Sequence, residues 1–257
     1  MEVRVLGCHG SQLPGFNKTS FLINGTVLVD AGTVTSVLTE DEQKNIDYIF
    51  VTHAHLDHVC DIMFLADNIF YFKKTRPLVV LSTPNIIETL KRCFFNGVVW
   101  PDFSVIPNAN NPVLKFVPLS AGETTSLAEL NITAIAVNHT VESFGYVVQA
   151  KEGSVIFVGD TGPTEEIWKI AGKTSALKAI FVETSFSDTM QDLAEITGHL
   201  TPSLLQQELN KMDVLPTVIY LYHMKPQSIE AIKREIVLLK NSRLHTLEDG
   251  QVLQIGA

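Results

Sequence analysis

The sequence predicts a single layered α/β domain, and three observations support this prediction. Short runs rich in β-branched and aromatic residues alternate with segments of helical periodicity, which is the pattern of packed sheets and helices. The length of 257 residues suits one large domain, and no Pro/Ser-rich stretch marks a linker within residues 1–257. A hydrophobic content of 46% with 18% charged residues supports a sizeable core and excludes an intrinsically disordered chain.

The predicted strands are short apolar runs bounded by Gly, Asn or Pro. In chain order they are Val3–Leu6, Phe21–Ile23, Thr26–Asp30, Tyr48–Thr52, Leu78–Leu81, Val113–Val117, Leu130–Val137, Phe144–Gln149, Val155–Gly159, Ala179–Glu183, Val218–Tyr222 and Val252–Ile255. Helices are predicted where apolar residues recur at helical spacing, and a proline in the first turn supports two of them. They cover Val59–Ile69, the segment from Thr201–Pro202 to Met212, and Ile229–Leu239 after Pro226.

The charge balance narrows the choice of partners. Lys and Arg total 19 against 28 Asp and Glu, which gives a formal net charge of −9. Proteins that hold a long phosphate backbone usually have the opposite balance. A small anionic substrate held through metal ions is compatible with this charge, because bound cations dominate the local field. We therefore expect a small anionic substrate and no long nucleic acid.

Cysteine usage and hydropathy indicate the compartment. Cys8, Cys60 and Cys93 form neither an even set nor a CxxC pair, which is typical of a reducing environment. No apolar run approaches the roughly 20 residues of a membrane-spanning helix, and the first residues do not have the pattern of a signal peptide. The expected location is the cytoplasm, with no membrane partner.

One long segment, residues 94–112, has no clear periodicity. Irregular loops of this length often act as lids or binding loops. Its aromatic residues Phe95, Trp100 and Phe103 could stack on a flat ligand or pack the loop onto the core. The sequence leaves both interpretations open.

A short internal similarity links Thr26–Thr33 (TVLVDAGT) with Ser154–Gly162 (SVIFVGDTG). In each, an apolar strand ends in Asp and Gly. Many strands end in this way, so the similarity alone favours an ordinary strand end. A duplicated half-domain would have the same pattern.

The motif that carries the chemistry lies in Tyr48–Val59 (YIFVTHAHLDHV), where an apolar strand runs directly into three histidines and an aspartate. Residues two apart in an extended chain point to the same side, so His53 and His55 can bind one ion. After the backbone turns, Asp57 and His58 fall at the start of the next helix and face a second ion. Imidazole and carboxylate ligands at this density suit zinc, manganese or iron rather than calcium.

Further ligands stand where later predicted strands stop, namely His139, Asp160 and His223. Strand ends are the places where α/β domains gather their sites. Each of these residues alone would be an ordinary cap or turn residue. Together with the first cluster they supply seven ligands, about the number that two bridged metal ions need.

The motif THAHLDH resembles the HxHxDH signature of the metallo-β-lactamase superfamily, and the later His, Asp, His series continues that family's pattern over essentially the whole chain. The resemblance implies an αββα sandwich of the metallo-β-lactamase type, with a dinuclear site at one edge. It also implies two divalent ions, with zinc as the first choice and manganese or iron as alternatives. Carried over, the first ion is held by His53, His55 and His139, the second by Asp57, His58 and His223, and Asp160 bridges them.

Four short blocks indicate one branch of the superfamily. They are GDTGP from Gly159, VETSF from Val182, GHLTP from Gly198 and HMKP from His223. Together they resemble the class II 3′,5′-cyclic-nucleotide phosphodiesterases. A related pairing of Glu with Gly-His-Ser-Thr occurs in tRNA 3′-end processing nucleases, so this feature by itself indicates phosphodiester hydrolysis.

Phosphodiester hydrolysis explains the residues in these blocks. Metal-bound hydroxide attacks phosphorus in line, and the departing 3′ oxygen needs a proton. We predict His199 as the general acid and Glu183 as the carboxylate that keeps it charged and oriented, beside Asp160 as the catalytic bridging ligand. Predicted substrate contacts are Lys225, Trp100 and Thr161. The expected reaction opens cyclic AMP or cyclic GMP to the 5′-monophosphate.

Several alternatives remain open. The helix after HLDH departs from the class II pattern at Asp61, Phe64 and Ala66–Asp67. This departure leaves the predicted metal ligands unchanged but leaves the identity of the substrate open. An RNA-processing nuclease, a lactonase or thioesterase, and a non-hydrolytic di-iron protein share this scaffold. The choice between adenine and guanine, and between cyclic mononucleotides and linear or larger cyclic nucleotides, is also open. A homodimer is expected only because dimers are the commonest soluble oligomers.

Overall fold

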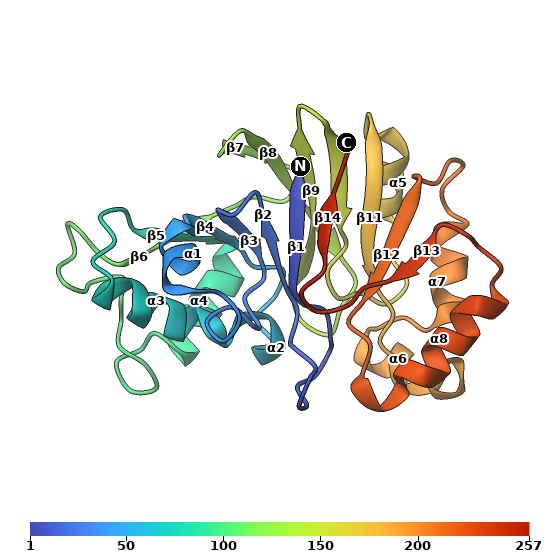
Figure 1. Cartoon of the computed structure of the whole chain (residues 1–257), viewed down its shortest axis with the longest axis horizontal. Helices are drawn as coiled ribbons and strands as arrows, with labels where there is room; N and C mark the ends of the chain where they lie inside the picture. Colours follow the sequence, from blue (N-terminus) through green and yellow to red (C-terminus); the bar gives the residue numbers. More distant parts are fainter. Residues whose placement is uncertain (257) are drawn as a thin grey trace.

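The computed structural model describes residues 1–256 and shows two seven-stranded sheets packed against each other (Figure 1). The first sheet has the order β14-β1-β2-β3-β4-β5-β6. Its antiparallel strands lie around β1, and its parallel strands run from β3 to β6. The strands are β1 (Glu2–Gly7), β2 (Ser20–Ile23), β3 (Val27–Val29), β4 (Tyr48–Phe50), β5 (Leu78–Ser82), β6 (Leu114–Pro118) and β14 (Val252–Gln254).

The second sheet has the order β13-β12-β11-β10-β9-β8-β7. Strands β10 to β13 are parallel, whereas β7 to β10 form an antiparallel meander. The strands are β7 (Thr124–Leu127), β8 (Leu130–Val137), β9 (Ser143–Ala150), β10 (Gly153–Phe157), β11 (Leu177–Glu183), β12 (Val218–Tyr222) and β13 (Leu244–Thr246).

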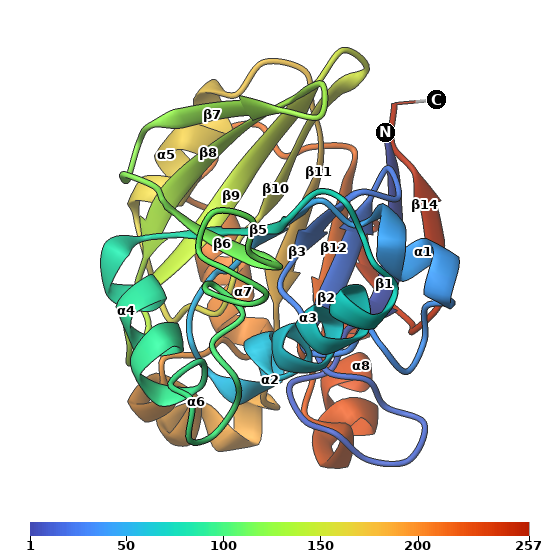
Figure 2. The same ribbon diagram turned by 90° about the vertical axis from the view of Figure 1, so that its left-hand side faces the viewer.

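Helices cover the outer side of each sheet, as the two perpendicular views show (Figures 1 and 2). The first sheet carries α1 (Glu40–Asn45), α2 (Leu56–Val59), α3 (Asp61–Tyr71) and α4 (Pro84–Cys93), and the second carries α5 (Glu166–Lys173), α6 (Gln191–Thr197), α7 (Pro202–Leu209) and α8 (Ile229–Leu238). The predicted αββα sandwich is therefore confirmed. Among residues 1–256, every helix is too short or too polar to cross a bilayer.

Aromatic side chains join the two sheets in the middle of the molecule. The Phe21 ring, on β2, lies 5.2 Å from the ring of Phe157, 5.5 Å from that of Phe181 and 5.2 Å from that of Tyr222, which all belong to the second sheet. These rings are at most 2% exposed. Since burying aromatic surface is a large stabilising contribution, this contact fixes how the sheets face each other.

All twelve predicted strands are present, most of them shifted by one or two residues at an end. The three predicted helices correspond to α2 with α3, to α7, and to α8. Two edge strands and four helices went unpredicted. Of these, α4 begins at Pro84 after Thr83, the same Thr-Pro start as in α7, and buries Ile86, Ile87 and Leu90; this signal was available in the sequence. Strand β7 is a half-exposed edge rich in Thr and Ser, without an apolar run to reveal it.

The irregular segment 94–112 packs onto the first sheet and α3. Phe95 and Phe103 are each 2% exposed. The Trp100 indole donates a hydrogen bond to the Met63 carbonyl at 3.1 Å, and its ring lies 5.1 Å from that of Phe64. Of the two interpretations of the aromatic residues, packing onto the core accounts for Phe95 and Phe103.

A buried carboxylate ties α5 to α7. Glu208 is 2% exposed, and its Oε2 accepts hydrogen bonds from the Thr164 amide at 2.9 Å and the Trp168 indole at 2.7 Å. Its Oε1 lies 2.7 Å from the Lys211 ammonium. A buried carboxylate is tolerated when all its hydrogen-bond and charge partners are present. Loss of one donor lowers the free energy of unfolding of the protein.

Replacing the donor should therefore destabilise the fold. We expect Trp168→Phe to lower the free energy of unfolding by about 1–3 kcal/mol through the lost hydrogen bond, with a further cost for the space left by the smaller ring. Urea denaturation followed by circular dichroism measures this. Tyr71→Phe is the control, because Tyr71 is 73% exposed and its variant should unfold like the parent. An unchanged midpoint for Trp168→Phe would show that Glu208 finds its donors elsewhere.

Candidate active site

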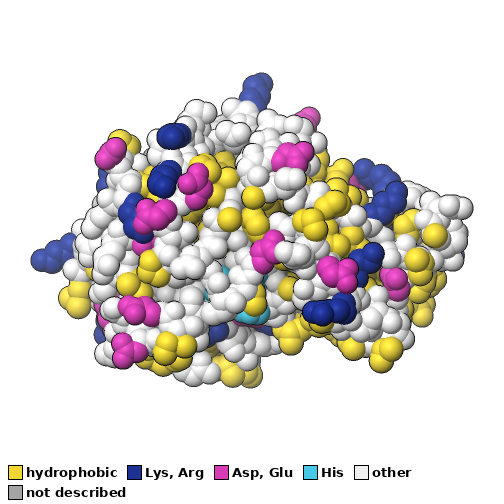
Figure 3. Space-filling view, turned by 180° about the vertical axis from the view of Figure 1, so that it is seen from behind, with side chains coloured by type: hydrophobic (Ala, Val, Ile, Leu, Met, Phe, Trp, Pro, Cys, Tyr) yellow, Lys and Arg dark blue, Asp and Glu magenta, His cyan; other side chains and the backbone are white. Residues whose placement is uncertain are grey.

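The predicted ligands come from the ends of strands in both sheets. The chain leaves β4 and brings His53 and His55 to the edge of the first sheet, and α2 then presents Asp57 and His58. His139, Asp160 and His223 lie beyond the ends of β8, β10 and β12 of the second sheet. The structure brings all seven together, and Figure 3 shows histidine side chains at the surface of a recess on this face.

The first group contains the three histidines predicted for one ion. Ligand atoms of His53, His55 and His139 all lie within 4.8 Å of one another. His55 Nδ1 is 3.3 Å from His139 Nε2, and the rings of His53 and His55 are 4.6 Å apart. Three imidazoles that converge in this way form a typical zinc or manganese ligand set.

The second group contains Asp57, His58 and His223, again within 4.8 Å. The Nε2 atoms of His58 and His223 are 3.1 Å apart, and His223 Nε2 lies 3.3 Å from Asp57 Oδ2. Two imidazole nitrogens and a carboxylate oxygen thus point at one volume. This is the donor set predicted for the second ion.

Asp160 stands between the two groups. Its Oδ2 lies 3.1 Å from His223 Nε2, 3.3 Å from His58 Nε2 and 3.7 Å from His53 Nε2. The side chain therefore reaches a member of each group. This is the position that a bridging carboxylate requires.

The residues present fit divalent metal ions. Within residues 1–256, His53 Nε2 and Asp160 Oδ1 are among the few buried side-chain polar atoms without a hydrogen-bond partner. Such atoms are costly to bury unless something binds them. His53 Nε2 faces the ligand cluster, 3.7 Å from Asp160 Oδ2, and a metal ion bound by His53 and the Asp160 carboxylate would satisfy such atoms.

Hydrogen bonds hold the ligand rings in orientation. Four histidines direct Nδ1 at a neighbouring oxygen and leave Nε2 for the cluster, which is how metal-binding histidines are usually fixed. The pairs are His58 with Asp30 Oδ2 at 2.7 Å, His53 with Thr52 Oγ1 at 3.0 Å, His139 with the Gly198 carbonyl at 2.7 Å and His223 with Ser185 Oγ at 2.8 Å. His55 is the exception, because it presents Nδ1 to the cluster.

These orienting partners were not predicted from the sequence, although a signal existed for one of them. Asp30 lies within the segment TVLVDAGT, which is similar to the segment containing Asp160. Both aspartates reach the site, one from each sheet: Asp160 as a candidate ligand, and Asp30 as the partner of His58. Asp30 also accepts the Thr52 amide at 2.8 Å and adopts a positive φ of 58°. The two similar segments therefore both contribute an aspartate to the candidate site.

The electrostatics suit metal binding. Burial and the neighbouring His58 lower the pKa of His53 below its ordinary value, which favours the neutral ring that coordinates metals. Burial would raise the pKa of Asp160, but His223 and His58 outweigh it and hold that pKa well below the usual range. Both shifts favour the forms that bind metal, namely an ionised Asp160 carboxylate and a neutral His53 ring.

A carboxylate and a histidine form a second unit beside the cluster. His199 Nδ1 lies 2.7 Å from Glu183 Oε1, and Glu183 is fully buried. The imidazole ring of His199 is 4.9 Å from that of His139 and 5.4 Å from that of His223. Burial would lower the pKa of His199, but the Glu183 carboxylate raises it above the ordinary value. The Glu183 carboxylate thus favours the protonated form of the imidazole at the rim of the ligand cluster.

Local structure fixes this pair. α6 ends at Thr197 and is capped by Gly198, whose φ of 67° favours glycine. α7 begins after Thr201, whose side chain accepts a hydrogen bond from the Leu204 amide. His199 lies in the short connection between the two helices. The Leu200 amide in the same connection donates to Glu183 Oε2 at 3.3 Å. The block GHLTP therefore encodes a turn that places the imidazole.

The predicted substrate contacts stay predictions. Thr161 is fully buried, and its amide donates a hydrogen bond to Glu183 Oε1 at 3.2 Å. The Lys225 ammonium donates to the Gly10 carbonyl, and the Trp100 indole is held on α3.

Comparison with known proteins agrees with this geometry. The family model described as the beta-lactamase superfamily domain matches residues 26–224. A 3′,5′-cyclic-nucleotide phosphodiesterase of Aliivibrio fischeri is 28% identical over 81% of this chain and 74% of its own length. A ribonuclease Z of Clostridioides difficile is 27% identical, over 57% of this chain and 48% of its own length.

A solved structure supports the same fold. The crystal structure of unliganded yeast PDE1 superposes with a TM-score of 0.83 and 17% identity, and the match covers 98% of each chain. The family match and the phosphodiesterase relative confirm the resemblance to metallo-β-lactamase hydrolases that the sequence motifs indicated. The ligand cluster at the strand ends, the two packed sheets and the matched residues 26–224 agree: the chain belongs to the metallo-β-lactamase superfamily of hydrolases.

Proposed function

We propose that this protein is a two-metal phosphodiesterase that hydrolyses a 3′,5′-cyclic nucleotide to the 5′-monophosphate. The observation that carries the proposal is the pair of His199 and Glu183, joined at 2.7 Å beside the seven-residue ligand cluster. A poor leaving group such as a sugar oxygen needs a proton, whereas a lactone or thioester has less need of a dedicated acid. The relatives named cyclic-nucleotide phosphodiesterases support this choice.

The chemistry divides between bound ions and this chain's own residues. Divalent ions held by the cluster would lower the pKa of a water molecule and neutralise negative charge on phosphate. Glu183 holds Nδ1–H of His199, so Nε2–H is the free donor. In the proposed reaction the bond between phosphorus and the 3′ oxygen breaks and a water oxygen bonds to phosphorus. His199 gives its proton to the 3′ oxygen, the attacking water loses one proton to solvent, and His199 regains a proton from solvent.

A cavity beside the cluster can hold the nucleoside. It has a volume of about 250 Å³ and is lined by His55, Asn85, Ile86, Val141 and Glu142, among others. Ile86 and Val141 offer apolar contacts for a base, and Glu142 offers acceptors for N–H or O–H groups. Since His55 is both a predicted ligand and a wall of this cavity, phosphate at the cluster and a base in the cavity are compatible.

Glu142 is already positioned for such a role. Its Oε1 accepts a hydrogen bond from the Thr83 hydroxyl at 2.5 Å, and its Oε2 accepts one from the side-chain Nδ2 of Asn85 at 2.7 Å. Each oxygen keeps a lone pair for substrate. We expect Glu142→Gln to raise KM about tenfold with little change in kcat, the effect of losing one charge-assisted hydrogen bond. Cyclic GMP should be affected more than cyclic AMP, because guanine presents two adjacent N–H donors.

Steady-state kinetics with both nucleotides measure this effect. Glu88→Gln is the matched control, because Glu88 is an exposed residue of the neighbouring α4. Equal KM values for Glu142→Gln and the parent would remove this cavity from substrate binding. A fall in kcat alone would instead connect Glu142 with the catalytic step.

The proposed activity is tested directly by incubating protein loaded with manganese or zinc with cyclic AMP and cyclic GMP, beside a chelator-treated sample. We expect 5′-monophosphates that form only without chelator. Cleavage of a tRNA precursor but not of cyclic nucleotides would favour the nuclease alternative, which the ribonuclease Z relatives represent. The net charge of −9 argues against that outcome.

A further inference from the structure

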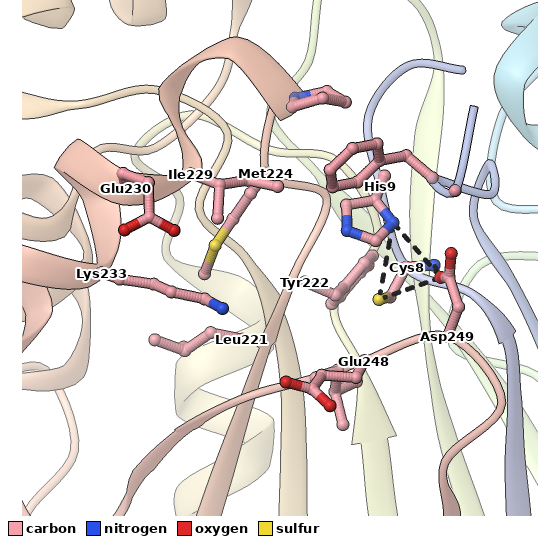
Figure 4. Close-up of a pocket in the computed structure, with 14 residues that line it drawn as sticks. Cys8, His9, Leu221, Tyr222, Met224, Ile229, Glu230, Lys233, Glu248 and Asp249 are labelled. Atoms are coloured by element: carbon pink, nitrogen blue, oxygen red, sulfur yellow. Dashed lines mark hydrogen bonds and ion pairs between the residues drawn. The ribbon is translucent and has the colours of Figure 1, made fainter. Parts of the chain in front are cut away.

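A second cavity contains none of the seven predicted ligands. It has a volume of about 490 Å³ and lies between the loop after β1, the end of β12, α8 and the turn before β14 (Figure 4). Apolar side chains such as Leu221 and Met224 form one side, and Glu230, Lys233 and Glu248 are charged wall residues. Cys8, His9 and Asp249 lie together at the opposite side, where their polar atoms meet.

These three residues converge on one point. Cys8 Sγ is 3.3 Å from Asp249 Oδ1 and 3.8 Å from His9 Nδ1, and His9 Nδ1 is 3.2 Å from Asp249 Oδ1. All three are protected, with Cys8 2% and His9 9% exposed as residues and the Asp249 side chain 18% exposed. A thiol, an imidazole and a carboxylate thus form a nearly equilateral triangle.

The triangle has the size of one face of a tetrahedral zinc site. With zinc about 2.3 Å from sulfur and about 2.0–2.2 Å from nitrogen and oxygen, tetrahedral angles put ligand atoms roughly 3.4–3.6 Å apart. The three observed distances lie within a few tenths of an ångström of these values. Little movement is needed for Cys8, His9 and Asp249 to bind one ion.

The surroundings hold the ligand atoms as a metal site requires. Asp249 Oδ1 accepts the Cys8 amide at 3.0 Å and Oδ2 accepts the Asn17 amide at 2.8 Å, which leaves lone pairs for an ion. The His9 ring packs edge-on against Phe16, with ring centres 4.9 Å apart. These contacts fix two of the three ligands before any ion arrives.

We propose that Cys8, His9 and Asp249 form a third metal site, which takes a single borderline-soft divalent ion of the zinc type and leaves its fourth position open to the 490 Å³ cavity. Sulfur and nitrogen ligands select zinc or cobalt over magnesium or calcium. Burial and Asp249 raise the pKa of the Cys8 thiol, so the free site carries S–H. As the bond between sulfur and the ion forms, this proton leaves to solvent.

The third site also supports the predicted catalytic ligand His223. The Cys8 carbonyl accepts the His223 amide at 2.7 Å, and Gly10 packs so closely that a Cβ there would lie 2.6 Å from His223 Nδ1. His223 itself adopts a positive φ of 65°, which a non-glycine residue keeps only when its surroundings enforce it. An ion bound by Cys8, His9 and Asp249 would hold the segment Cys8–Gly10 in place, and this segment enforces the backbone conformation of His223.

Cobalt titration tests the third site independently of catalysis. Thiolate bound to Co²⁺ gives a charge-transfer absorption in the near ultraviolet, and the seven predicted catalytic ligands include no cysteine. We expect metal-depleted protein to take up three equivalents of Co²⁺, one of them with this absorption. Cys8→Ser should take up two equivalents without it. Cys93→Ser, which removes an exposed thiol elsewhere, should behave like the parent.

A second variant separates metal binding from folding. Asp249→Asn keeps the thiol and the shape of the side chain, and we expect it to weaken the charge-transfer site by more than the about 10–100-fold that loss of an orienting partner costs. Near-ultraviolet circular dichroism establishes that each variant is folded. Saturation of the parent at two equivalents without the absorption would overturn the proposal, as would an absorption that persists in Cys8→Ser or an unchanged affinity in Asp249→Asn.

Discussion

Replacing His199 with alanine should lower kcat by about 10²–10⁴-fold, the range expected for a positioned general acid, and leave the metal content unchanged. The reason is geometric: His199 faces the ligand cluster while Glu183 holds its Nδ1 at 2.7 Å. Turnover of a cyclic nucleotide and metal analysis of the same sample measure the two quantities. A substrate with an acidic phenol as leaving group should lose much less rate, because it departs without a proton.

His245→Ala is the matched control for this variant. His245 is an exposed histidine on β13, and its removal should leave both kcat and metal content as they are. Parallel loss of metal and activity in His199→Ala would make His199 a ligand or a structural residue. Equal losses on the cyclic nucleotide and the phenolic substrate would contradict proton donation to the leaving group.

Replacing Asp160 with alanine should have the largest effect on metal binding. Asp160 Oδ2 lies within 3.7 Å of Nε2 atoms from both ligand groups, so its loss removes the bridge and the negative charge that offsets the cluster of imidazoles. We expect the metal content to fall from two ions at the cluster to at most one, and activity to fall with it. Metal analysis after gel filtration measures the first, and product formation the second.

The control for Asp160→Ala is Asp41→Asn on α1. Its side chain is 93% exposed, so the change alters net charge equally without touching the cluster. A fully loaded Asp160→Ala protein would exclude Asp160 as a bridging ligand. Full loading with lost activity would leave Asp160 a catalytic role that does not depend on holding the ions.

The fold was largely predictable because its strands are local apolar runs. Strand β12 is a continuous apolar segment and β8 is a largely apolar one, and both were predicted at their observed ends. The edge strands β6 and β14 were predicted, whereas the edge strands β7 and β13 were not. Strand β7 exposes half of its residues, and its place in the sheet depends on pairing with β8. Tertiary pairing, rather than local sequence, decides such elements.

The grouping of the candidate ligands was predictable for a different reason. Imidazole and carboxylate groups at fixed spacing after a strand seldom occur together unless they bind something, and the structure brings all seven together. An orienting residue such as Ser185 carries no such pattern, and Asp30 was marked only by the similarity of its segment to the one that contains Asp160. Their orienting roles follow from distances of 2.7 Å between Asp30 and His58 and 2.8 Å between Ser185 and His223. The triangle of Cys8, His9 and Asp249 likewise joins residues up to 241 positions apart.

The division of the ligands between two sheets has a consequence for biosynthesis. The four candidate ligands of residues 53–58 are synthesised early. The second group is complete only when His223 has been synthesised, 165 residues after His58. A nascent or truncated chain therefore contains only part of the ligand set, which binds metal weakly. The complete cluster forms only when both sheets have met, so hydrolytic competence arrives in one late step of synthesis.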